Sequence, residues 1–119
     1  MKAPAYRWSD LEDDSPVAGL KRKKVVGEHI LVARIKLDKG SHVDVHFHDS
    51  EQIAMIMSGH VRWTIGANGS PDQYQLEMSA GEVLHLPSNL PHGIDILEDS
   101  EIIDLLSPVG PMGIDSHGR

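Results

Sequence analysis

Histidine is the residue type that stands out in this sequence, with eight among 119 residues, and His46 and His48 lie two positions apart. On a strand, residues i and i+2 project to the same face, so both imidazoles would point the same way. The apolar neighbours Val45 and Phe47 would face the other side. Since imidazole is the commonest protein metal ligand, the pair has the geometry of a chelate. The alternative is two half-exposed strand histidines with no shared role.

Two further residues extend this pattern. Gln52 has the same parity as His48, whereas regular alternation points Glu51, the stronger ligand by chemistry, to the other face. His92 follows a loop stiffened by Pro87 and Pro91, at the point where the chain re-enters a strand. A proline-locked loop loses less entropy when it holds a ligand. The alternative for this segment is a surface turn with an incidental histidine.

The elements that must position these residues are short strands. Apolar residues alternate with polar ones, between turn signals, over residues 31–37, 43–47, 53–57, 61–65, 74–78, 83–86, 94–96 and 102–106. Turns are expected at 58–59 and 98–100. Residues 1–24 are a polar lead-in with at most one short strand, residues 25–108 form the folded body, and residues 109–119 form a flexible tail. This spacing predicts an all-β sandwich or barrel in a single domain.

Two motifs in this body resemble those of the cupin family. The first is Gly40-x5-His46-x-His48-x3-Gln52-x6-Gly59, and the second is Gly81-x5-Pro87-x-Asn89-x2-His92. By this resemblance the chain is a small single-domain cupin, an RmlC-like jelly roll or double-stranded β-helix. The resemblance implies one divalent metal ion, of zinc, nickel, manganese or iron, held by His46, His48, Gln52 and His92. It also implies a homodimer, in which residues 1–24 supply an exchanged strand.

Glutamine in place of the usual motif glutamate is similar to one group of small cupins, which open the ring of uronates released during pectin degradation. That resemblance assigns Asp104 as the catalytic acid or base. The group's substrate-clamping arginine corresponds to Gly110 here, so that contact is missing. From the residues alone, Asp104 shares parity with Ile102 and Leu106 on an apolar face. The alternatives for Asp104 are a strand-edge position in solvent or an ion pair with Arg34 or Arg62.

Neutral imidazole and amide ligands leave a metal its full charge, which favours Lewis-acid chemistry over redox cycling. The first expectation is therefore an isomerase, ring-opening enzyme or lyase acting on a small oxygenated or sugar-like molecule. A metal-dependent dioxygenase is the second, and a non-catalytic ligand-binding or sensing cupin is the third.

The composition limits the partners and the cellular location that we expect for this protein. The net charge of −7 disfavours nucleic acid as a partner, and the chain has no apolar run long enough to cross a membrane. The absence of cysteine excludes disulfide scaffolds and thiol chemistry within this sequence. A cytoplasmic location is the expectation that follows.

Overall fold

The computed structural model describes residues 1–115 as an antiparallel β structure with seven strands and two short 3-10 turns. The strands are β1 (Leu20–Val26), β2 (Leu31–Leu37), β3 (His42–His46), β4 (Glu51–Ile65), β5 (Tyr74–Ser79), β6 (Val83–Leu86) and β7 (His92–Ser107). The turns are η1 (Trp8–Asp10) and η2 (Gly113–Asp115). The sequence-based prediction of an all-β jelly roll is confirmed.

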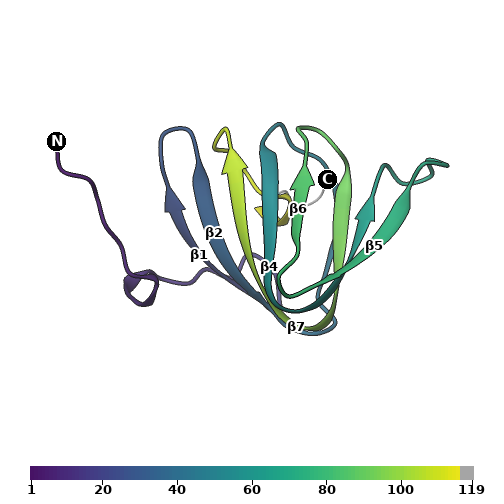
Figure 1. Cartoon of the computed structure of the whole chain (residues 1–119), viewed down its shortest axis with the longest axis horizontal. Helices are drawn as coiled ribbons and strands as arrows, with labels where there is room; N and C mark the ends of the chain where they lie inside the picture. Colours follow the sequence, from purple (N-terminus) through teal and green to yellow (C-terminus); the bar gives the residue numbers. More distant parts are fainter. Residues whose placement is uncertain (116–119) are drawn as a thin grey trace.

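The two long strands, β4 and β7, hold the barrel together. Their amino- and carboxyl-terminal halves pair with different neighbours: β7 pairs with β3 through its first half and with β2 through its second, and β4 pairs with β6 and then with β5. The strands rise from the bends of β4 and β7 at the bottom of Figure 1, while the amino-terminal segment extends away from the barrel. His46 ends β3 and His92 begins β7, and His48 follows β3.

Each long strand covers two of the predicted short ones, because the expected turns at 58–59 and 98–100 are irregularities inside continuous strands. The register between β4 and β7 shifts between Ile56 and Val61. Gly59 sits in this stretch with φ 89°, and a Cβ there would lie 2.7 Å from the Cα of Ser100. The glycine therefore marks a bulge where two strands bend together, and not the end of a strand.

The barrel begins earlier than residue 25. β1 starts at Leu20 and pairs along its whole length with β2 in the same chain. The boundary expected at residue 25 is corrected, because β1 begins inside the predicted lead-in and continues past that boundary. Leu20 and Arg22 point inward and are buried, and Lys21 is exposed on the other face.

The carboxyl-terminal segment is also corrected. Residues 109–119 were expected to be a flexible tail, but Met112 and Ile114 are buried and belong to the hydrophobic core. In Figure 1 the yellow segment after β7 turns back across the barrel. The remaining residues of the predicted tail, 116–119, lie outside the described residues.

The core fills the inside of the barrel with side chains from nearly every strand. Its buried members are Leu20, Leu31, Ala33, Ile35, Leu37, Ala54, Ile56, Val61, Trp63, Ile65, Met78, Leu86, Ile94, Ile96, Ile102, Leu106, Met112 and Ile114. No helix within residues 1–115 is long and apolar enough to cross a membrane.

Candidate metal centre

Three of the predicted ligands converge at one end of the barrel. His46 ends β3, His48 follows it, and His92 begins β7 directly opposite His46. One ring nitrogen from each lies within 4.8 Å of the others. The ring centroids of His46 and His92 are 4.4 Å apart, and those of His48 and His92 are 5.1 Å apart. These spacings allow all three nitrogens to contact one ion.

The local backbone fixes which nitrogen each ring offers. The Nδ1 atoms of His46, His48 and His92 lie 2.7, 2.9 and 2.8 Å from the carbonyl oxygens of Asp44, Ser50 and Leu90, respectively. Since a carbonyl can only accept, each Nδ1 carries the proton and donates it. The neutral ring then keeps a lone pair on Nε2, which is the form that binds metals.

Electrostatics favour the same neutral form. Burial lowers the pKa of His92 to about 4, and burial also lowers the pKa of His46 below its usual value. The Nε2 of His48 is buried and has no hydrogen-bond partner among the described residues. A buried polar atom without a partner is costly, and a metal ion at this point would satisfy it. The donor set therefore fits a divalent cation.

Gln52 and Asp104 form a buried pair beside these rings. Gln52, on β4, donates from Nε2 to Oδ1 of Asp104, on β7, at 2.9 Å. This bond commits the amide nitrogen and leaves the amide oxygen, which is the atom a cation would use. Burial raises the pKa of Asp104 to about 7, although the bond from Gln52 acts in the opposite direction. The carboxyl can therefore hold or release a proton near neutral pH.

These residues line a cavity of about 50 Å³ whose walls are otherwise mostly apolar. His46, Gln52, His92 and Asp104 form its polar side. Asp104 is 5% exposed, so the alternative of a solvent-facing position is wrong. The alternative ion pairs are absent too, because Arg34 pairs with Glu101 and Arg62 contacts Asp95.

The proline loop is hydrogen-bonded to neighbouring segments at two points. The backbone N–H of Asn89 donates to the carbonyl of His48 at 2.9 Å, and that of Gly66 donates to Pro91 at 2.8 Å. Asn89 adopts a left-handed φ of 65°, a conformation that asparagine tolerates better than most residues. The loop is thus tied to His48 and to Gly66, which directly follows β4.

Sequence reasoning missed one part of the cavity wall. Met112, Gly113 and Ile114, in the segment expected to be a flexible tail, all line the cavity. The signal available was the alternation of Met112 and Ile114 around a glycine. It is too short to separate a docked segment from a frayed end.

Comparison with known proteins gives the family. Residues 33–107 match the family model described as a cupin domain. The acireductone dioxygenase of Geobacillus thermodenitrificans is 25% identical over 73 residues, which cover 61% of this chain and 41% of that protein. The chain therefore spans about two fifths of the curated relatives that it matches.

Solved structures share the fold over nearly the whole chain. An RmlC-like cupin from Shewanella frigidimarina has a TM-score of 0.80 at 22% identity, covering 91% of this chain and 93% of its own. KdgF from Halomonas sp. has a TM-score of 0.80 at 23% identity, with 92% and 96% covered. With a family model that covers most of the barrel and structural neighbours of the same architecture, the chain belongs to the cupin family.

Proposed function

We propose that the protein holds one divalent metal ion on the Nε2 atoms of His46, His48 and His92, with the amide oxygen of Gln52 as a fourth ligand. One observation carries this proposal: three convergent imidazoles each donate from Nδ1 to a backbone carbonyl, so their Nε2 atoms are left for a cation. Zinc, nickel, manganese and iron all suit such a donor set.

We further propose a Lewis-acid enzyme of the isomerase, ring-opening or lyase type, acting on a small oxygenated or sugar-like molecule. A divalent ion with neutral ligands would keep its charge and polarise a substrate oxygen. Asp104 would move the substrate proton. Its Oδ1 accepts from Gln52, which leaves Oδ2 for that task. The apolar walls would keep bulk water from the reacting atoms.

A dioxygenase is the second candidate, and the similarity to acireductone dioxygenase is the observation that favours it. A three-histidine site is also compatible with oxygen chemistry when the metal is iron. The two candidates differ in what they consume. Oxygen uptake with the iron-loaded protein would support the dioxygenase, and turnover with a redox-inert ion would support the Lewis-acid enzyme.

The first experiment is elemental analysis of the protein purified without a tag. We expect about one metal ion per chain, and none in His46→Ala. His85→Ala is the matched control, because His85 is an exposed histidine that contacts Glu51 on the outer surface. Loss of metal from both variants, or no metal in the unmodified protein even after reconstitution, would contradict the proposal and leave a ligand-binding barrel.

We also propose a cytoplasmic homodimer. Ile53, Met57 and Val83 are exposed apolar side chains on β4 and β6, with exposed fractions of 38%, 49% and 60%. A second copy covering this surface would remove it from water. Sedimentation equilibrium tests the proposal: we expect twice the chain mass of 13.1 kDa, reduced to the chain mass in Val83→Glu. A single-chain mass for the unmodified protein would contradict it.

A further inference from the structure

The segment that follows β7 crosses the barrel opening and is anchored at both ends; we call residues 108–115 the strap. At its start, Ser50 donates from Oγ to the carbonyl of Pro108 at 2.6 Å. The carbonyl of the same Ser50 accepts from Nδ1 of His48. Ser50 therefore contacts both the candidate ligand His48 and the start of the strap.

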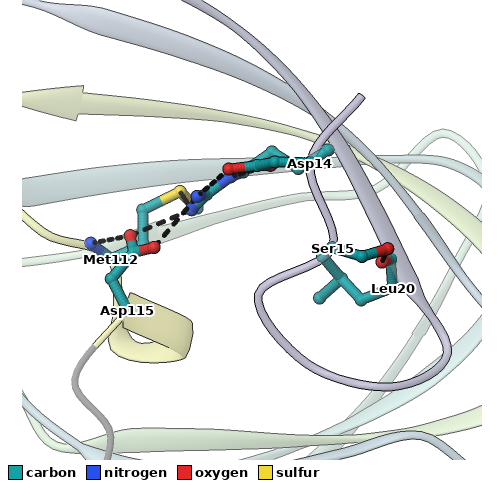
Figure 2. Close-up of polar contacts among 6 residues, drawn as sticks. Asp14, Ser15, Leu20, Met112 and Asp115 are labelled. Carbon is teal, nitrogen blue, oxygen red and sulfur yellow. Dashed lines mark hydrogen bonds and ion pairs between the residues drawn. The ribbon is translucent and has the colours of Figure 1, made fainter. Parts of the chain in front are cut away.

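The far end of the strap is fastened by a buried cation. Arg22, on β1, is 2% exposed, and its guanidinium binds both carboxylate oxygens of Asp115 at 2.9 Å. The other edge of the guanidinium binds both oxygens of Asp14, at 2.9 and 2.7 Å. In Figure 2 Asp14 lies on one side of this cluster, and Met112 and Asp115 lie on the other.

Asp115 also folds the strap onto itself. Its Oδ2 accepts from the backbone N–H of Met112 at 3.0 Å, and its own N–H donates to the Met112 carbonyl at 2.8 Å. The sulfur of Met112 lies 3.5 Å from the Arg22 guanidinium. One carboxylate thus closes the turn η2 and attaches that turn to the barrel wall.

The middle of the strap forms one wall of the cavity, over the His46 ring. Gly113 packs so tightly on the His46 ring that a methyl group in its place would overlap the imidazole, at Nε2 first. Met112 and Ile114 are 6% and 7% exposed and line the cavity on either side of that glycine. A cavity of about 50 Å³ has room for about four water molecules, or an organic molecule of a few heavy atoms.

The residues that line the cavity restrict the polarity of a bound molecule as well as its size. Its apolar walls come from residues such as Leu20, Ile35, Leu37 and Ile102. No lysine or arginine of the described chain lines it. Arg22 lies close by, but both edges of its guanidinium are taken by Asp14 and Asp115. A second anionic group on a ligand would therefore find no cationic partner on the protein inside the cavity.

We propose that the strap determines which molecules reach the candidate metal site, and that its closed form admits small molecules with one oxygen-bearing end and an otherwise apolar body. This inference rests on the proposed function. Larger molecules would enter after Asp115 releases Arg22 and the strap lifts from His46. The apparent affinity for such a molecule is reduced by the fraction of chains that are open.

The test uses the full-length protein loaded with Co²⁺, whose absorption spectrum reports ligands bound to the ion. The probes are formate and benzoate, which share a carboxylate and differ in size. We expect formate to perturb the spectrum of the unmodified protein at concentrations where benzoate does not. In Asp115→Asn, benzoate should bind about tenfold more tightly than in the unmodified protein, while formate should change little.

Asp14→Asn is the matched control, since it removes a carboxylate from the same guanidinium without touching the strap. We expect it to leave both probes as they are. Equal binding of benzoate and formate to the unmodified protein, or equal effects of the two variants, would overturn the proposal.

A second readout needs no metal. In the metal-free protein, amide hydrogen exchange across residues 108–115 should be about tenfold faster in Asp115→Asn and unchanged in Asp14→Asn. Unchanged exchange in Asp115→Asn would overturn the strap proposal by itself. Failure of the unmodified protein to take up Co²⁺ would instead overturn the proposed function.

Discussion

Each candidate ligand is oriented by the backbone within two residues of itself. His46 and His92 donate to carbonyls two residues before them, and His48 donates to one two residues after it. Carboxylates often play this part at metal sites and raise the basicity of the ring. Carbonyl partners, unlike carboxylates, add no negative charge beside the three rings. This is consistent with the proposed Lewis-acid chemistry.

Asp104→Asn separates proton transfer from metal binding. The asparagine oxygen can still accept from Nε2 of Gln52, so the amide oxygen of Gln52 keeps its position and the metal content should stay near one ion per chain. Turnover should fall by about 100-fold or more, because the proposed proton-transferring group is lost. The checks are elemental analysis and kcat on one preparation. Loss of metal would instead make Asp104 a positioning residue for Gln52.

The sequence predicted the residues of the site better than their contacts. Parity and motif spacing singled out His46, His48 and His92, and the structure brings their ring nitrogens together. The bond between Gln52 and Asp104 was not predicted. Parity places each residue on a face of its own strand, but the contact depends on the register between β4 and β7, in which Ala54 lies opposite Asp104. No local pattern encodes that register.

At the scale of elements, the bend shared by β4 and β7 depends on Gly59. Gly59→Ala would force a Cβ against the backbone of Asp99 and Ser100 at a φ of +89°. We expect it to lower the free energy of unfolding by at least about 2 kcal/mol. Gly69→Ala is the control, since Gly69 has φ +82° with nothing within 4 Å of a Cβ. It should cost about 1 kcal/mol from conformation alone.

Urea denaturation of the two glycine variants measures the difference. Equal losses would mean that the two strands separate at Gly59 without cost, and that close approach does not require a glycine there.

The attachment of the strap should depend on pH. Burial alone would raise the pKa of Asp115, but hydrogen bonds from Arg22 and from the Met112 N–H hold it below its usual value. The hydrogen bond from Arg22 also lowers the pKa of Asp14. A carboxyl with a lowered pKa in the folded state stabilises the fold above its unfolded pKa, near 3.8, and this contribution is lost as the pH falls further.

Asp115→Asn tests this sign. At pH 7 the variant should be less stable than the unmodified protein by about 1 kcal/mol, a value reduced for the partial exposure of Asp115. At pH 3 the difference should be smaller, because the Asp115 carboxyl of the unfolded, unmodified protein is then mostly protonated and the contribution of the ion pair is being lost. Histidine titration is common to both proteins and cancels in the comparison. A constant difference between pH 7 and pH 3 would show that the ion pair does not control stability.

The elements show where local patterns stop being informative. Alternation located β2, β5 and β6 closely. The same pattern predicted two short strands in place of β4 and two in place of β7, because a glycine or an acidic run occurs in bulges as well as in turns. It allowed one short strand within residues 1–24 but did not locate β1, because Arg22 occupies an inward position and is buried only as the partner of Asp14 and Asp115. Asp115 is distant in sequence and no local pattern marks Asp14 as a partner, so a buried arginine was indistinguishable from a solvated one.

At the scale of the whole molecule, the charges are unevenly distributed along the chain. Residues 1–39 carry nine of the 11 lysines and arginines and six of the 18 acidic residues, so they are net positive, and the remainder is strongly acidic. Lys21 and Lys36 lie opposite one another in the β1–β2 pair, as do Lys23 and Arg34. Like charges in register are unfavourable, and in the second pair the carbonyls of Trp8 and Leu11 bind Lys23 and the carboxylate of Glu101 binds Arg34.

The candidate metal centre joins β3 and β4 to β7, which is distant from both in sequence, so an ion bound there should stabilise the whole barrel. His46 ends β3, Gln52 lies in β4 and His92 begins β7. A ligand that binds the folded state alone, at 100 times its dissociation constant, adds about 2.7 kcal/mol. For a domain of this size that corresponds to a rise in Tm on the order of 10 °C.

Thermal unfolding of metal-free protein, with and without Ni²⁺ or Zn²⁺, measures the shift. His85→Ala should retain it and His92→Ala should lose it while remaining β-rich by circular dichroism. An equal shift in both variants would place the stabilising ion elsewhere on the molecule.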